Sequence, residues 1–468
     1  MEIKPEFNFK YLLGISLVSA LGGLLFGYDL VVIGGAKEFY ELVYNLSSPA
    51  MQGWAVSSCI VGCIIGAMGV GKPSDVFGRK KLLIIAAMMF FVSAIGSGYA
   101  PTFTQFVLYR LLGGIGMGIA STLSPMYIAE VSPAKFRGRF VSLNQMTIVI
   151  GILLAQLVNY LILQSHPVPE GVTDAALLDT WNGQTGWRWM FVAEAIPALL
   201  FCLFMFLVPN SPRWLCRVGR TEKARSVMEK IGGTEYAAES LASITRTFDE
   251  TSTHHELAEL LKPKMVRILL IGVVLAIFQQ WCGINIVFSY AHDIFKAAGY
   301  SVDGVLFNLV IIGFTNFIFT VVAMATVDKL GRKVLILWGS AGLAVSYVVV
   351  GICFHLHIQG IVVLIAVLGA IACFSATLGP VMWVLISEIF PNRVRGIATS
   401  IAVLSLWVAN FILQSTFPII KEALSIAATF WIYAGICVLG VIFIKLFIPE
   451  TKGKTLEEIE SSLSVELS

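Results

Sequence analysis

The sequence has little charge for its length. Only 13% of its 468 residues are charged, about half the share in an ordinary globular protein, whereas 57% are hydrophobic and the mean hydropathy is +0.83. A soluble protein of this size could not bury so much apolar surface. The composition therefore excludes a soluble multidomain protein and predicts an integral membrane protein. The net charge of +3 carries no sign of nucleic-acid binding.

Signatures of several other protein classes are also absent. The eight cysteines are scattered, mostly within apolar runs, and include no CxxC pair, which argues against a disulfide framework or a zinc site. The sequence has no phosphate-binding P-loop to support direct drive by ATP, and no nucleophile–base pair to suggest an enzyme. The first apolar run is too long for a signal peptide, so we expect a retained membrane helix. No cofactor or metal is expected.

Apolar runs long enough to cross a bilayer as a helix, which takes about 20 residues, occur twelve times. They cover residues 11–36, 53–71, 82–100, 105–129, 140–163, 189–208, 266–290, 306–327, 334–354, 361–386, 396–420 and 427–447. A long polar segment separates the sixth run from the seventh, and its stretches 221–231 and 236–248 are typical of short amphipathic helices.

The sequence thus predicts an all-α membrane protein with twelve transmembrane helices in two six-helix halves. The predicted domains are a first half at 1–208, a cytosolic helical insert at 209–265, a second half at 266–448 and a tail at 449–468. Of the 32 lysines and arginines, 27 lie in the two termini and the even-numbered connections, and four lie in the odd-numbered ones. This bias predicts that both termini and the insert face the cytosol.

The two predicted halves repeat one another. Acidic and basic residues fall at matching positions in cytosolic loops of both halves: Asp75 with Arg79, Glu130 with Arg137, Asp328 with Arg332, and Glu388 with Arg395. Repeated halves of this kind can enclose a central cavity and rock around it. We expect these residues to form a cytosolic gate, in which ion pairs hold that face shut. The alternative is that the basic turns merely enforce topology.

Three charged residues fall inside predicted spans. Asp29, Arg110 and Glu194 each lie roughly 8–12 Å below the outer rim, at 1.5 Å per residue. Because isolated charges in a bilayer are costly, such groups normally pair or line a wet cavity. A buried carboxyl holds its proton tightly, and an adjacent arginine loosens that hold. A carboxyl that alternates between the two states can carry a proton. The alternative is a static ion pair that holds helices together.

Amide side chains gather near the middle of the seventh predicted span. Gln279 and Gln280 lie roughly 18–20 Å from its start, and Asn285 follows one and a half turns later. Amides donate and accept hydrogen bonds without charge, as sugar hydroxyls do, although membrane amides also join helices to one another. Other spans supply further polar and aromatic candidates, which are Gln145, Asn316, Phe374 and Trp383. For Trp383 the alternative is an interfacial or core-packing role.

Several motifs together resemble those of the sugar porter family of the major facilitator superfamily. They are the GRK turns after Asp75 and Asp328, PxxxAExxPxxxRG at 125–138, PxSPR at 209–213, QQxxGxN at 279–285 and PETKG at 449–453. The resemblance covers nearly the whole chain. It implies a major facilitator fold in a cell membrane, and proton-coupled transport of a monosaccharide by alternating access. The partners it implies are the sugar, the proton and the lipid bilayer, with a monomeric chain.

The resemblance also implies residue roles. Asp29 stands where proton-coupled members carry an acid, so it is expected to take the proton, with Arg110 tuning it and Glu194 secondary. The residues at sugar-contacting positions are Gln145, Gln279, Gln280, Asn285 and Trp383, with Phe26, Asn316 and Phe374 as further lining. The remaining alternatives are a passive sugar facilitator and, more distantly, a sugar sensor.

The sequence departs from the family pattern at three positions. Leu406 replaces a glutamine and removes one possible hydrogen bond to sugar, Ser289 replaces a tyrosine near the outer gate, and Asn210 replaces a glutamate of the cytosolic gate. These departures bear on which sugar is preferred and on the strength of gating. Gly379 and Pro380, just before Trp383, are expected to break the tenth helix.

Overall fold

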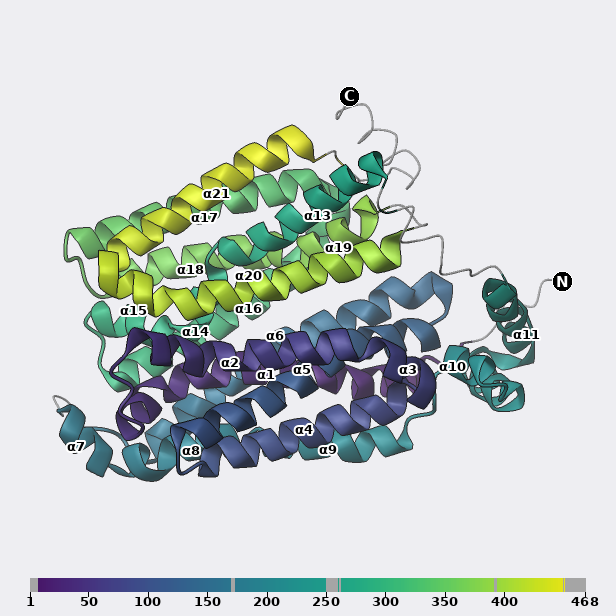
Figure 1. The fold of residues 1–468 in the computed structure, drawn as a ribbon, viewed down its shortest axis with the longest axis horizontal. Helices are drawn as coiled ribbons and strands as arrows, with labels where there is room; N and C mark the ends of the chain where they lie inside the picture. Colours follow the sequence, from purple (N-terminus) through teal and green to yellow (C-terminus); the bar gives the residue numbers. More distant parts are fainter. Residues whose placement is uncertain are drawn as a thin grey trace. The chain divides into compact units, whose positions relative to one another are not determined.

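The computed structural model describes residues 7–169, 173–249, 260, 262–390, 394–448 and 450, and within them it contains helices and no strand (Figure 1). In chain order the helices of the N-terminal part are α1 (Phe9–Val43), α2 (Pro49–Gly69), α3 (Gly71–Phe77), α4 (Arg79–Tyr99), α5 (Phe103–Val131), α6 (Arg137–Ser165), α7 (Asp174–Asp179), α8 (Trp187–Val192), α9 (Ala195–Leu207), α10 (Pro212–Arg217) and α11 (Thr221–Asp249). The C-terminal part contains α13 (Pro263–Trp281), α14 (Ile284–Ser289), α15 (Ala291–Ala297), α16 (Val302–Leu330), α17 (Arg332–His355), α18 (Ile361–Ala376), α19 (Leu378–Ile389), α20 (Arg395–Leu424) and α21 (Ile426–Phe447).

Within the described residues, 12 helical segments are long and apolar enough to cross a membrane, and each overlaps one predicted span. The all-α, twelve-span prediction is therefore confirmed. The first span differs most in extent, because α1 continues to Val43 instead of ending near residue 36. The helix can continue because Lys37 is not a loop residue: it is 1% exposed and pairs with Glu41 one turn later.

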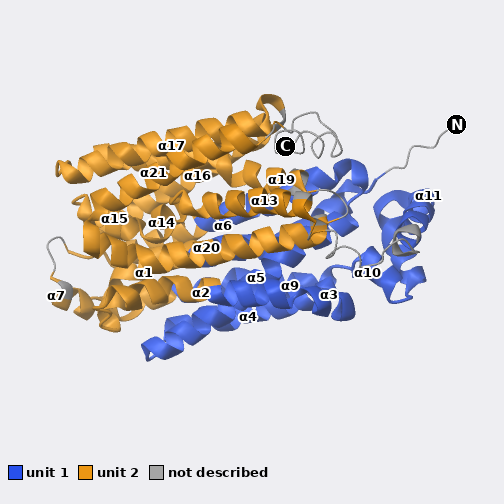
Figure 2. Ribbon diagram, turned by 45° about the horizontal axis from the view of Figure 1, so that its top comes forward, with its two compact units in different colours: residues 1–30, 61–152, 191–252 blue, residues 31–60, 153–190, 253–468 orange. Residues whose placement is uncertain are grey.

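The chain forms two compact units (Figure 2). Unit 1 contains residues 1–30, 61–152 and 191–252, and unit 2 contains residues 31–60, 153–190 and 253–468. The boundaries between the units cut through α1, α2, α6 and α8, because the units follow spatial contacts and not the sequence repeat. The domain boundaries expected from the repeat therefore stay a prediction.

Close helix packing organises unit 1. A Cβ atom on Gly27 of α1 would lie 1.9 Å from the carbonyl oxygen of Ile148, and one on Gly151 of α6 would lie 2.0 Å from that of Leu24. The two helices therefore cross at reciprocal glycines, as small residues allow in membranes. In the same unit α4 packs against α5 and α9, and α10 packs against α11. As expected for two short helices, α11 is interrupted at Gly232 and Gly233.

Breaks in the membrane helices shape unit 2. Gly283 separates α13 from α14 and has a φ of +85°, a conformation that favours glycine. A Cβ atom there would also lie 2.8 Å from the ring of Tyr433. The tenth span is broken between α18 and α19, at Thr377, two residues before the predicted Gly379, and Gly379 and Pro380 lie in the first turn of α19. Around these breaks α13 packs against α20, and α17 packs against α18 and α21.

Candidate functional site

A buried ion pair joins α1 to α5 in unit 1. The Nη1 atom of Arg110 bonds Oδ1 of Asp29, and Nη2 donates to the backbone oxygen of Asp29 at 3.2 Å. The two residues are 2% and 1% exposed. Gly113, one turn after Arg110, lies beside this pair: a Cβ atom there would lie 3.5 Å from Oδ2 of Asp29 and 2.3 Å from Oγ of Ser93. The structure thus brings together two residues that were predicted from the sequence to lie at one depth in the membrane.

Glu194 provides the third charge. It lies at the start of α9 and is 2% exposed, and it is near enough to Asp29 and Arg110 to interact with both electrostatically. Among the described residues its Oε1 atom has no hydrogen-bond partner. The guanidinium carbon of Arg110 lies 5.7 Å from the ring centre of Phe191. The site therefore contains two buried carboxyls and one guanidinium, which leaves one carboxyl without a cation of its own.

A chain of amides lies in unit 2. Gln280 donates from Nε2 to Oε1 of Gln279 at 2.6 Å, and Asn285 donates from Nδ2 to Oε1 of Gln280. The break at Gly283 starts a new helix and so brings Asn285 back toward Gln280. Asn285 also donates to Oδ1 of Asn410 at 3.2 Å. The three amides predicted from the seventh span therefore contact one another, together with a fourth from α20.

Asn410 and Gln414 were missed by the sequence reasoning. Both are 1% exposed, and Nε2 of Gln414 donates to Oδ1 of Asn410 at 3.1 Å. The signal was present, because the two amides are four residues apart and so share one helix face with Leu406. Leu406, which stands where the family pattern has a glutamine, is therefore followed on the same face by an amide one turn later and another two turns later.

The other predicted sugar contacts are less tightly defined. Asn316 is 5% exposed, and its Oδ1 atom accepts from Oγ of Ser375 at 2.7 Å. Phe374 is half-buried, and Trp383 is 40% exposed on α19. The half-buried Gln145 and Phe26 belong to unit 1, whereas the amide chain belongs to unit 2. A shared role for these residues in binding sugar stays a prediction.

Three of the expected gate residues of the first half form one cluster. Arg79 donates from Nε to Oε1 of Glu130 at 3.2 Å, and its Nη1 atom donates to Oδ1 of Asp75 at 3.3 Å. Ser211 donates to the other oxygen of Glu130, and Arg217 lies 2.5 Å from Asp75. Ser211 and Arg217 were not predicted, although Ser211 belongs to the PxSPR motif. The insert therefore takes part in this cluster through α10 and the turn before it.

The remaining gate residues behave differently. Arg137 is exposed, and its Nε atom donates to the backbone oxygen of Ala129 at 3.2 Å. In the second half, Glu450 of the PETKG motif accepts from the backbone N–H groups of Arg332 and Lys333 at 3.0 and 3.2 Å. A carboxylate is well placed there, at the N-terminus of α17. The side chains of three predicted gate residues lie outside the described residues: Asp328, Glu388 and Arg395.

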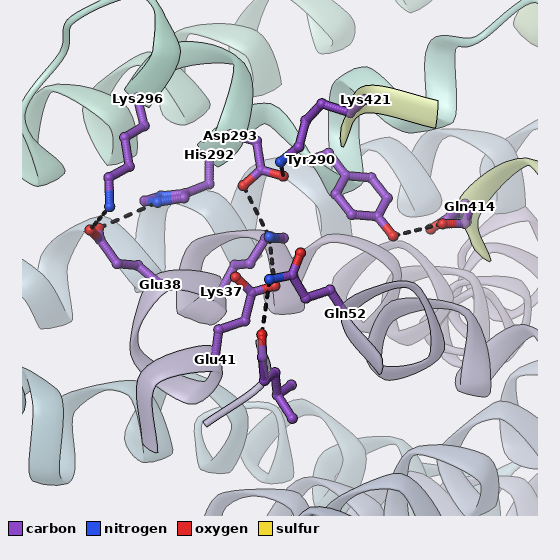
Figure 3. A network of polar contacts seen from close by, with 11 residues as sticks. Lys37, Glu38, Glu41, Gln52, Tyr290, His292, Asp293, Lys296, Gln414 and Lys421 are labelled. Carbon is purple, nitrogen blue, oxygen red and sulfur yellow. Dashed lines mark hydrogen bonds and ion pairs between the residues drawn. The ribbon is translucent and has the colours of Figure 1, made fainter. Parts of the chain in front are cut away.

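A second buried charge cluster was not predicted at all (Figure 3). Lys37 of α1 lies 2.6 Å from Oε1 of Glu41 and 3.0 Å from Oδ1 of Asp293 on α15. The other oxygen of Asp293 lies 3.0 Å from Lys421 on α20. Burial raises the pKa of Asp293, but Lys37 and Lys421 lower it more, to about 2. Asp293 is therefore a carboxylate shared by two ammonium groups, and we refer to these four residues as the Lys37 network.

Glu38, next to Lys37, faces a separate set of partners. Its Oε1 atom lies 2.6 Å from Lys296, and its Oε2 atom lies 3.3 Å from Nε2 of His292 (Figure 3). Burial lowers the pKa of His292, which lies between the seventh and eighth spans, and the negative charge of Glu38 offsets this only in part. The imidazole is therefore neutral at neutral pH.

The neutral state of His292 predicts a loss of stability in mild acid. Its pKa in the folded protein lies below the value of about 6.5 in an unfolded chain, so its contribution is complete above about pH 6.5 and falls as the pH drops below that value. The groups that face it are Glu38, Asp293, Lys37 and Lys296. Apparent melting temperatures in detergent at pH 7.5 and 5.5 should differ by roughly 1 °C less in His292→Gln than in the natural protein. The exposed His355, changed to Gln, should leave the pH dependence as it was.

The described residues offer no metal site of three or more histidine, cysteine or acidic side chains, and all eight cysteines are free. The buried polar groups that the structure does show are ion pairs and neutral amides. Together with the twelve spans, these features define a multi-pass membrane protein with polar sites suited to small uncharged solutes and protons.

Comparison with known proteins identifies the family of the chain. A model of the Sugar (and other) transporter family matches residues 15–463. The D-xylose-proton symporter of Escherichia coli (strain K12) is 43% identical, over 98% of this chain and 97% of that protein, and the arabinose-proton symporter of Bacillus subtilis (strain 168) is 38% identical, also over 98% and 97%. The inward open structure of the xylose transporter XylE from E. coli matches with a TM-score of 0.83 and 40% identity, covering 96% of this chain and 99% of that one. The chain belongs to the Sugar (and other) transporter family and has the fold of that transporter.

Proposed function

We propose that the protein is a proton-coupled symporter that carries a monosaccharide, D-xylose before other pentoses or hexoses, across the membrane by alternating access. The observation that carries the proposal is the buried pair of Asp29 and Arg110, with Glu194 as an additional carboxyl beside it. The names of the relatives support the same solutes, since they include a D-xylose-proton symporter and an arabinose-proton symporter.

The buried acid gives the coupling a physical basis. In general a guanidinium beside a carboxyl favours the charged form of that carboxyl, and Arg110 is paired with Asp29 in this way. When the pair separates, a carboxyl in so dry a place is favoured in its protonated form. A conformational change that moves the arginine away from the acid therefore binds a proton, and its reversal releases one. Glu194 is the secondary acceptor for Arg110.

Sugar recognition rests on the amides. Gln279, Gln280 and Asn285 can each donate to and accept from hydroxyl groups, and they carry no charge that would bind water more strongly than sugar. The aromatic residues Phe26, Phe374 and Trp383 suit the apolar C–H face of a sugar ring. Gln145 and Asn316 complete the proposed set of contacts.

The topology belongs to the same proposal. The lysine and arginine bias supports a cytosolic position for both termini and the insert. The bacterial relatives support an inner membrane as the location. The cluster around Arg79 then lies on the cytosolic side, where it can close that face, and the Lys37 network lies on the external side. The protein acts as a monomer.

Proteoliposomes test the function directly. Addition of D-xylose outside vesicles that contain the protein should raise the external pH, because protons enter with the sugar. Counterflow of labelled D-xylose against a panel of unlabelled sugars should then show which sugar competes best. Saturable uptake without any pH change would support the passive facilitator instead. Sugar binding without transport would support the sensor.

A further inference from the structure

The direction of the hydrogen bonds along the amide chain fixes what each amide can offer. Asn410 accepts at Oδ1 from Asn285 at 3.2 Å and from Gln414 at 3.1 Å. A carbonyl oxygen has two lone pairs, so both acceptor positions of Asn410 are used by the protein. The group that Asn410 can present to a ligand is therefore its NH2, a hydrogen-bond donor.

The backbone of Gln414 is itself held by a hydrogen bond from outside its own helix. In a regular helix its carbonyl oxygen would accept from the N–H of the residue four positions later, but that residue is Pro418, which has none. The hydroxyl of Tyr290 donates to this carbonyl at 2.7 Å (Figure 3). Tyr290 is buried, and its ring centre lies 5.6 Å from Nζ of Lys37. The turn of α20 that contains Gln414 is thus attached to the start of α15.

A plain structural role is the alternative. Two amides four residues apart on a helix can bond to one another merely to satisfy buried polar groups. Such a pair would contribute to stability and would be indifferent to the substrate. The Asn410–Gln414 pair differs because Asn410 also bonds Asn285, and Asn285 bonds Gln280. A change in the orientation of the Asn410 amide would therefore alter the amides that we propose as sugar contacts.

We propose that Gln414 is a positioning residue for sugar specificity, which holds Asn410 with its NH2 group toward the substrate and its oxygen toward the protein. The proposal rests on the proposed sugar transport. The ligand group it selects is a sugar hydroxyl that accepts a hydrogen bond. Leu406, one turn before Asn410 on the same face, supplies no hydrogen bond of its own, so the orientation of Asn410 decides what this part of α20 offers to the sugar.

Two variants separate positioning from packing. Gln414→Met retains the size and flexibility of the side chain and removes the donor. Gln414→Glu places a carboxylate against Oδ1 of Asn410, and the repulsion between the two acceptors should turn the amide round. Ser415→Ala is the matched control, because within the described part of the chain Oγ of Ser415 bonds only to backbone oxygens of its own helix, of which the nearest is that of Phe411 at 2.7 Å.

The experiment measures uptake of labelled D-xylose by proteoliposomes, together with competition by the four monodeoxy analogues of D-xylose. In Gln414→Met the KM should rise about fivefold, the factor that one ordinary hydrogen bond contributes, with Vmax within about twofold of the natural protein. In Gln414→Glu the KM should rise further. In both variants one monodeoxy analogue, the one that lacks the hydroxyl bound by Asn410, should compete as well as D-xylose does. The other three should still compete less well than D-xylose.

The outcomes are distinct. A KM and an analogue profile equal to those of the natural protein in Gln414→Met would overturn the proposal, as would a fall in Vmax with unchanged KM, which is the sign of a structural role. If Gln414→Met does not fold, the analogue profile of Gln414→Glu decides by the same criteria. If the natural protein takes up no sugar saturably, the transport function itself is refuted. This result would be known before either variant is measured.

Discussion

Asp29→Asn should abolish accumulation of sugar against its gradient while leaving exchange of sugar across the membrane. Asparagine has nearly the same shape and can still accept from Arg110, but it cannot bind and release a proton. A pH gradient of one unit is worth about 1.4 kcal/mol per proton, so at one proton per sugar the natural protein should concentrate sugar about tenfold. The variant should equilibrate it at a ratio of about one. The measurement is uptake of labelled D-xylose by proteoliposomes with an imposed pH gradient, compared with counterflow without one.

Glu194→Gln is the matched control for this experiment. Glu194 lies in the same buried site, but its Oε1 atom has no hydrogen-bond partner among the described residues, whereas Asp29 is bonded to Arg110 through both its side chain and its backbone. Its loss should reduce accumulation without ending it. If Asp29→Asn still concentrates sugar when the outside is acidic, the proton is carried elsewhere and the proposed coupling fails. Loss of counterflow as well would point to the static ion pair as the true role of Asp29.

The sequence allowed the transmembrane part of the fold to be predicted, because the physical rule involved is local. A run of about 20 apolar residues has few options other than a spanning helix, and a helix rises by a fixed amount per residue. That is why Asp29, Arg110 and Glu194 could be assigned to one depth from the position of each within its span. Their pairing then followed from the cost of leaving a charge alone in lipid.

The features that the sequence did not reveal depend on which helix faces pack together. The spacing of Asn410 and Gln414 puts both on one face of α20, but the sequence does not say what that face packs against, and the contact of Asn285 with Asn410 supplies this. Lys37 and Asp293 are 256 residues apart, and nothing in the local sequence of either indicates the other. Lys37 was read as a loop residue because the apolar run ends beside it. In the helix it lies one turn from Glu41, and that pairing compensates for its burial.

Lys37→Met should strongly destabilise the protein. Lys37 is 1% exposed and stands between the carboxylates of Glu41 and Asp293, so its removal leaves two buried negative charges with Lys421 as their remaining cation in the network. Breaking a buried ion pair by removing one partner costs about 3–5 kcal/mol, because the other charge stays buried without compensation. The apparent melting temperature in detergent, followed by intrinsic fluorescence, should fall by roughly 3–5 °C.

Lys296→Met gives the comparison that makes the result specific. Lys296 lies 2.6 Å from Glu38 in the neighbouring pair, but its side chain is 53% exposed. Glu38 is itself buried, with a side chain 7% exposed, but water reaches the ammonium group of Lys296, so the melting temperature should fall by less than in Lys37→Met. Lys37→Met combined with Asp293→Asn should recover part of the stability lost in Lys37→Met, because the neutral amide removes one of the two stranded charges. Two results would contradict this account. One is a fall in melting temperature in the double variant equal to the sum of the two single falls, and the other is an equal fall in Lys37→Met and Lys296→Met. Either would show that the contacts of Lys37 with these carboxylates do not hold α1 to α15.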